Sequence, residues 1–180
     1  MQTWIPTATG GRVWFEPIDV SQVKLRDVAV GLSRVCRFAG QMSQLVPFYS
    51  VAEHSVWASY IAPPGQRIAA LVHDAAEAFI GDVTSPLKHM LPDYKELEAR
   101  FEAALWKHFD WPDSKTAAVK SADRRMLARE RLDLVQDQRT LWTDCEGIIP
   151  ADVKLEKWLP TMAAVVWEDR YKQLQERGDY

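Results

Sequence analysis

Apolar residues recur at three- and four-residue steps along most of the chain, and this spacing predicts amphipathic helices. A first helix is expected over residues 25–40 and a second over residues 50–61. A third is expected over residues 66–80, ending at Gly81.

The second half of the chain continues this helical spacing. Ser85 and Pro86 suit the N-cap and first turn of a short helix. Longer helices are expected over residues 92–110 and 114–141, and Pro160 begins the last one. No repeat or low-complexity segment interrupts the series.

The first twenty residues instead predict a short β-hairpin. Residues 4–5 and 12–15 have strand-like composition, and Gly10 and Gly11 supply the turn between them. The whole pattern predicts an all-α fold class, a bundle of about six to seven helices with an N-terminal β-hairpin.

The expected organisation is one domain over residues 1–180. It comprises the hairpin (1–20), a core (21–142) and a C-terminal helical segment (155–178). A chain of this length can bury a substantial single core.

Composition narrows the possible partners and compartments. The net charge of −3 argues against long nucleic acid as a partner. No secretory signal or membrane-spanning run is present, and Cys36 and Cys145 are too few for a disulfide framework. We therefore expect a cytoplasmic protein without membrane contact.

A histidine and a carboxylate, His73 and Asp74, lie next to each other in an otherwise apolar segment. Burying both is unfavourable unless something pairs with them, and a metal ion is an efficient partner. His54 and Asp123 on other predicted helices would complete a set of two imidazoles and two carboxylates. This set suits one divalent transition metal such as Co, Mn, Zn, Ni or Fe.

Each ligand candidate also has a simpler interpretation. His54 is equally explained as a hydrogen-bonded core histidine, and Asp123 as a surface partner of Arg124 or Arg125. The pattern as a whole is more specific than any member.

In order, His54, His73-Asp74 and Asp123 resemble the H…HD…D signature of HD-domain metal-dependent phosphohydrolases. Neighbouring motifs resemble the YfbR-like 5′-deoxynucleotidase branch and small phage enzymes that remove triphosphate from dATP. These motifs are residues 48–56, 73–77, 81–82 and 85–88, and the similar region covers about residues 26–134. The resemblance implies an HD-domain helical bundle that acts on a deoxynucleotide.

Two acidic residues are candidates for catalysis. Glu77 follows His73 by four residues, so a helix would place both side chains on one face. The resemblance implies that Glu77 orients or deprotonates the attacking water, whereas a carboxylate that only fixes His73 is the alternative. Asp82 is expected to protonate the leaving group or bind sugar, and is otherwise a turn aspartate.

Three further residues are expected to contact substrate. Arg37 and Lys88 occupy positions where the resembled enzymes place phosphate contacts, although isolated basic residues are often only solvated. Phe38 stands where YfbR-like enzymes carry tryptophan against the deoxyribose. It keeps an aromatic face but lacks the indole N–H.

The expected function is metal-dependent hydrolysis of the 5′ phosphate ester of a small deoxynucleotide. Both a dNTP, with dATP favoured, and a dNMP remain open as substrates, and additional Mg²⁺ would accompany the phosphates. The alternatives are a non-catalytic, metal-stapled nucleotide-binding module and an HD hydrolase of another phosphoester. A homo-oligomer is expected from the eight tryptophans, which favour core or subunit contacts.

Overall fold

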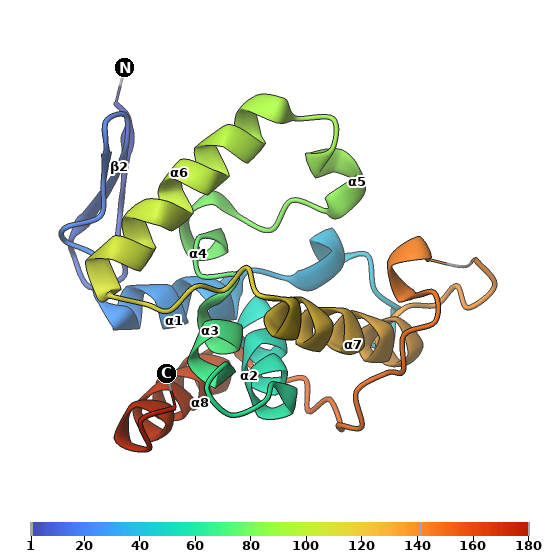
Figure 1. Ribbon diagram of the computed structural model, residues 1–180. Coiled ribbons are helices and arrows are strands. Elements are labelled where there is room, and N and C mark those ends of the chain that lie inside the picture. The colour runs from blue at the N-terminus through green and yellow to red at the C-terminus, as the bar shows by residue number, and fades with distance from the viewer. Residues whose placement is uncertain (1, 141, 180) are drawn as a thin grey trace.

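The computed structural model describes residues 2–140 and 142–179, and the chain is mostly helical (Figure 1). Its N-terminal strands form an antiparallel sheet in the order β1-β2-β3, comprising β1 (Trp4–Pro6), β2 (Arg12–Phe15) and β3 (Ile18–Asp19). This confirms the predicted hairpin, and Gly10 adopts the positive φ that its turn requires. The two-residue β3 carried too little pattern to be predicted.

The described residues form eight α-helical segments and two 3₁₀ helices. The longer segments are α1 (Leu25–Arg34), α2 (Val51–Ile61), α3 (Arg67–Val72), α6 (Pro92–Phe109), α7 (Ala117–Leu134) and α8 (Pro160–Glu176). The short ones are α4 (Glu77–Ile80), α5 (Ser85–Lys88), η1 (Arg37–Gly40) and η2 (Thr143–Cys145).

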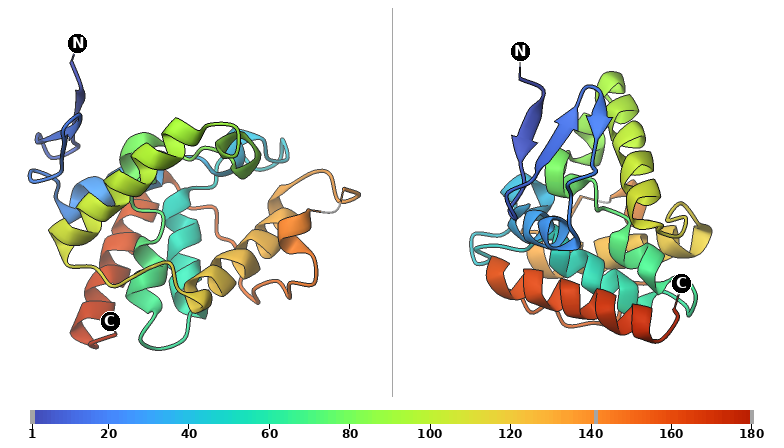
Figure 2. Two further views of the ribbon diagram at one scale, coloured as in Figure 1. Left: turned by 45° about the horizontal axis from the view of Figure 1, so that its top comes forward. Right: turned by 90° about the vertical axis from the view of Figure 1, so that its left-hand side faces the viewer.

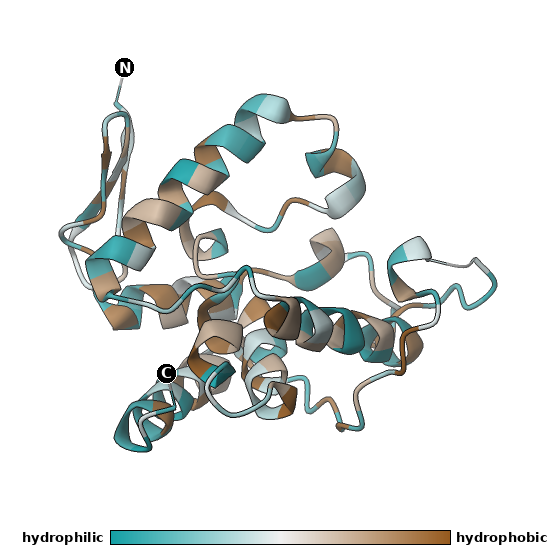
Figure 3. Ribbon diagram, viewed as in Figure 1, coloured by the Kyte–Doolittle hydropathy of each residue, from teal (hydrophilic) through white to brown (hydrophobic). Residues whose placement is uncertain are grey.

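The core lies where α8 packs against α1, α2 and α3 (Figure 2). Trp167 of α8 is fully buried there, as is Leu32 of α1. Phe101 and Leu105 bring α6 onto the same core. Figure 3 shows hydrophilic and hydrophobic positions intermixed along α6 and α8, as expected for helices with one buried face.

The helix predicted over residues 66–80 is interrupted, which corrects the sequence interpretation. Helix α3 ends at Val72, and α4 begins only at Glu77. Between them the backbone hydrogen bonds have the i to i−3 spacing of a 3₁₀ turn. The N–H of Ala75 donates to the carbonyl of Val72, and the N–H of Glu77 donates to the carbonyl of Asp74. His73 and Asp74 therefore lie in a tight turn at the end of a helix.

The helix predicted over residues 114–141 is also shorter than expected. Helix α7 ends at Leu134, because the following segment turns back and bonds to the helix end. The amide of Gln138 donates to the carbonyls of Arg131 and Val135. The predicted end at Leu141 lies outside the described residues.

Two other predicted boundaries shift. The first helix, expected over residues 25–40, ends at Arg34, and the separate 3₁₀ helix η1 follows it. The N-cap of α5 is Thr84, and Ser85 is its first residue. Helix α8 begins at Pro160, as predicted, within the C-terminal segment 155–178. The residues just before it bond to α2. The buried carboxylate of Glu53 accepts the backbone N–H groups of Glu156, Lys157 and Trp158, so this acidic group serves a structural purpose. Across the described helices, none has the length and apolar character needed to cross a bilayer.

Candidate metal centre

Three side chains from distant segments converge on one point. His54 comes from the buried helix α2, His73 from the turn after α3, and Asp123 from α7. One ligand atom of each lies within 4.8 Å of the other two, so the group could hold a metal ion. The core residues Ala122 and Met126 flank Asp123 and hold this face of α7 inward.

Both imidazoles direct the same nitrogen into the centre. His54 Nδ1 lies 2.6 Å from Glu130 Oε1, and His73 Nδ1 lies 2.7 Å from the carbonyl oxygen of Ala70. A carbonyl only accepts, so Nδ1 of His73 carries the proton, and a carboxylate imposes the same arrangement on His54. Each buried Nε2 has no hydrogen-bond partner in the described structure. This is the arrangement in which histidine binds a metal.

The spacing of these atoms suits a shared cation. Asp123 Oδ1 is 3.3 Å from His54 Nε2 and 3.9 Å from His73 Nε2. Asp74 Oδ2 is 3.8 Å and 3.2 Å from the same two nitrogens. Ligands about 2.1 Å from one ion are roughly 3.0–3.4 Å apart at tetrahedral or octahedral angles, so small adjustments suffice. His54, His73 and Asp123 could therefore hold a metal ion, and Asp74 lies beside this group without belonging to it.

The electrostatics of the centre favour positive charge. Burial works to lower the pKa of His54, as does Arg37, but Glu130 and Asp123 outweigh both and raise it to about 9. Burial works to raise the pKa of Asp123, but its interactions with His54 and His73 outweigh burial and hold this pKa well below the usual range. The carboxylates around the two imidazoles thus favour positive charge at this point.

Glu130 supports this centre and was not identified from the sequence. It is fully buried, accepting from His54 with Oε1 and from Nη2 of Arg37 with Oε2 at 2.9 Å. Burial opposes its ionisation, but Arg37 and His54 lower its pKa to about 2. Its spacing of seven residues from Asp123, two turns of one helix, was the available signal.

Arg37 lies beside the centre, in η1 rather than at the end of the first helix. Its Nη1 is 3.9 Å from Asp74 Oδ2, and its buried Nε has no partner among the described residues. The guanidinium therefore spans two carboxylates of the centre and retains a donor. The adjacent Phe38 contacts the edge of Trp142, with ring centroids 5.8 Å apart.

Glu77 and Asp82 are two acidic groups whose charges interact with that of Arg37. Burial raises the pKa of Glu77 well above its usual range, with further contributions from Asp74 and Asp82, and its Oε2 has no hydrogen-bond partner in the described part of the chain. Burial likewise raises the pKa of Asp82, while Arg37 opposes the shift.

Lys88 is near these acids, but its ammonium is already paired. Its Nζ lies 2.7 Å from Glu98 Oε1 on α6, and it sits 5.9 Å from the ring centre of Tyr94. Lys88 was expected to contact phosphate, and its ion pair with Glu98 of α6 was not predicted from the sequence. A phosphate would have to draw Lys88 from Glu98.

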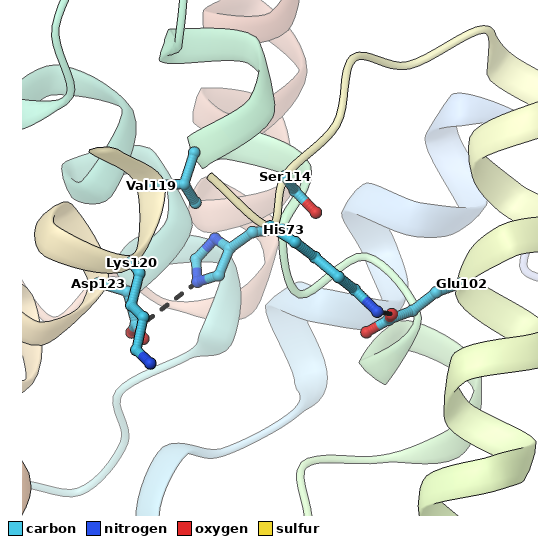
Figure 4. A pocket seen from close by; sticks show the side chains of 7 residues that line it. His73, Glu102, Ser114, Val119, Lys120 and Asp123 are labelled. Atoms are coloured by element: carbon cyan, nitrogen blue, oxygen red, sulfur yellow. Dashed lines mark ion pairs between the residues drawn. The ribbon is translucent and has the colours of Figure 1, made fainter. Parts of the chain in front are cut away.

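A pocket of about 350 Å³ opens next to the centre (Figure 4). His73 and Asp123 form one side of it, and the α6–α7 connection forms the other. The remaining lining residues are Glu102, Ser114, Lys115, Val119 and Lys120. The metal centre therefore has access to a space large enough for a small ligand.

Comparison with known proteins identifies the family of this chain but does not identify an activity. No family model matches it. It is 37% identical over 175 residues to the uncharacterized protein YfdR of Escherichia coli, with 97% of each chain covered. It is also 34% identical over 129 residues to the uncharacterized protein RCAP_rcc00048 of Rhodobacter capsulatus, which covers 67% of this chain and 65% of that protein. The chain belongs to the YfdR family.

Proposed function

We propose that this protein is an HD-type, metal-dependent phosphohydrolase that cleaves the 5′ phosphate ester of a small deoxynucleotide. One observation carries the proposal. Two buried imidazole Nε2 atoms without hydrogen-bond partners in the described structure face carboxylates, next to a buried glutamate whose Oε2 is also unpartnered. Leaving buried polar atoms without hydrogen bonds is costly in a purely structural site.

The metal would be held by His54, His73 and Asp123, with Asp74 beside them. A divalent metal supplies Lewis acidity, which lowers the pKa of water and offsets charge on phosphate oxygens. Glu130 would keep His54 in the required tautomer, and Arg37 would donate to a phosphate oxygen through its free Nε.

Glu77 would accept a proton from the attacking water. The water oxygen forms a new bond to phosphorus, while the ester bond from phosphorus to the 5′ oxygen breaks. The electron pair of that bond stays on the 5′ oxygen, which takes a proton from Asp82. The raised pKa values of both carboxyls favour proton exchange nearer neutral pH than an ordinary carboxyl allows.

The test is to incubate the purified protein with dAMP or dATP in Co²⁺ or Mn²⁺ and to identify the products. Nucleoside plus phosphate, or nucleoside plus triphosphate, is the expected result. A Glu77→Gln variant should keep its metal, measured by elemental analysis, and lose at least about a hundred-fold in turnover.

Other outcomes overturn specific parts of the proposal. Bound metal without turnover of either nucleotide supports a metal-stapled binding module instead. Turnover of a different phosphoester alone would retain the hydrolase and reject the nucleotide. Unchanged turnover in Glu77→Gln would remove this residue from proton transfer.

A further inference from the structure

The carboxyl of Asp82, the proposed acid, is not held in place by contacts of its own. It forms no hydrogen bond or ion pair with any residue that the structure describes. The charges of Arg37 and His54 nevertheless act on it, so it lies within reach of the metal centre. A side chain without polar contacts takes its position from its backbone. The backbone around Asp82 therefore decides where this proton donor lies.

That backbone is fixed at Gly81, the residue before Asp82. The N–H of Gly81 donates to the carbonyl of Glu77 at 2.9 Å, and its own carbonyl accepts the hydroxyl of Tyr94 at 2.9 Å. Gly81 ends α4 with a φ of 81°, in the left-handed region that glycine favours. Its carbonyl and the N–H of Asp82 belong to one planar peptide group. The hydroxyl of Tyr94 therefore sets the orientation of the peptide that carries Asp82.

Tyr94 lies on a helix that is itself firmly anchored. Phe101 and Leu105, further along α6, are fully buried in the core. One turn after Tyr94, Glu98 forms the ion pair with Lys88 at the end of α5. Helix α6 thus contacts both the start of the connection from α4 and the end of α5, beside which it runs in Figure 1. It provides a rigid support for the segment between them.

The hydroxyl of Tyr94 is a lasting hydrogen-bond donor. Burial raises its pKa above the usual value, and the charges of Glu98 and Glu77 raise this pKa further. The hydroxyl therefore keeps its proton at neutral and moderately alkaline pH. Tyr94 belongs neither to the metal-binding group nor to the lining of the pocket beside it. Its influence on the centre passes through the peptide of Asp82.

We propose that Tyr94 is a positioning residue, which holds the Asp82 carboxyl where it can protonate the leaving group. This inference rests on the proposed hydrolase function. When the bond from phosphorus to the 5′ oxygen breaks, its electron pair stays on that oxygen, which takes the proton of Asp82. Proton transfer depends on the distance and alignment of the two groups, so a displaced peptide slows it. Metal binding and substrate binding do not depend on this proton.

The first test measures the backbone without requiring activity. Amide hydrogen exchange of the metal-free protein is followed by NMR in the unmodified chain and in Tyr94→Phe. The Gly81 amide should exchange about ten-fold faster in the variant, because its peptide loses one of its two anchors. Tyr60→Phe is the matched control, since this tyrosine of α2 is 49% exposed and its hydroxyl bonds to no residue in the described ranges. Unchanged exchange at Gly81 in Tyr94→Phe would overturn the inference.

The second test uses the metal-loaded protein and the nucleotide that it hydrolyses. Tyr94→Phe should lower kcat about ten-fold, with the KM and the metal affinity unchanged. The same nucleotide with sulfur in place of the bridging 5′ oxygen releases a thiolate, which leaves without a proton. With this substrate the loss in kcat should shrink to less than about two-fold.

The outcomes separate the inference from the proposed function. An equal loss in kcat with the oxygen and sulfur substrates, or no loss with either, overturns the role of Tyr94 and keeps the hydrolase. Absence of hydrolysis in the unmodified protein rejects the hydrolase and the acid role of Asp82 with it. Faster exchange at Gly81 would then assign Tyr94 only to the stability of this turn.

Discussion

His54 Nδ1 and Glu130 Oε1 lie 2.6 Å apart, and both side chains are fully buried. The same carboxylate binds Arg37 through its other oxygen at 2.9 Å. Glu130 therefore connects a metal-ligand candidate with a phosphate-contact candidate. A substitution of Glu130 should therefore alter the positions of both His54 and Arg37.

Replacing Glu130 with glutamine tests this connection. Glu130→Gln keeps the size of the side chain but removes the charge that orients His54 and Arg37. We expect metal affinity, measured by competition with a chromogenic chelator, to fall about ten- to hundred-fold. Asp133→Asn, a change at a partly exposed carboxylate of the same helix, is the control and should have no effect. Equal affinity of Glu130→Gln and the unmodified protein would show that the contact is only structural.

Metal binding should stabilise the folded chain, because the ligands meet only after folding. At a free metal concentration of about 100 times the Kd, the expected gain is about 2.7 kcal/mol, or a rise of several degrees in Tm. Thermal unfolding with Co²⁺, and again after removal by chelator, measures it. Asp123→Asn should lose most of the rise while still folding. A rise of the same size in Asp123→Asn would place the metal elsewhere.

The affinity for metal should increase with pH. In the metal-free chain the pKa of His54 is about 9, so at neutral pH the metal must displace a proton from this imidazole. Below about pH 9 each unit of pH lost should weaken binding by up to about ten-fold for each displaced proton, and above it this dependence should vanish. Chelator competition between pH 6.5 and 9.5 checks the slope. A flat profile would contradict protonated imidazoles in the metal-free centre.

Three of the four expected ligands, His54, His73 and Asp123, form the group that could hold a metal ion. The two histidines were predictable because the chain has only four and these two lie in apolar segments, whereas Asp123 lies beside two arginines and was suggested by the order of the motifs. Glu130 was not predictable in this way, since it lies between Arg129 and Arg131 and resembles a solvated helix face. Its seven-residue spacing from Asp123 was a weak signal, and its complete burial shows that it belongs to the interior.

The helical architecture was also largely predictable, whereas the break after Val72 was not. No glycine or proline marks it, and its alanine-rich sequence favours a continuous helix. Packing decides the local backbone here, as it decides that Lys88 pairs with Glu98 ten residues away. Such pairings depend on how α5 and α6 are placed, which periodicity does not specify.

Gly31 provides a final prediction, because it sets how closely α4 approaches α1. A Cβ on Gly31 would lie 2.6 Å from the Cβ of Ala78 and 2.7 Å from its carbonyl oxygen. Ala78 follows Glu77 directly, so Gly31→Ala should displace the proposed catalytic carboxyl. We expect a destabilisation of about 1–3 kcal/mol in denaturant unfolding.

The effect of Gly31→Ala on function should be separable from its effect on stability. Turnover should fall while metal affinity changes little, because the α4 backbone moves and the imidazoles of α2 and the preceding turn are held by their own contacts. The double variant Gly31→Ala with Ala78→Gly removes one of the clashing methyl groups and should recover part of both stability and turnover. A Gly31→Ala protein as stable and active as the original would mean that α4 is free to shift, and that the position of Glu77 is not fixed by its contact with α1.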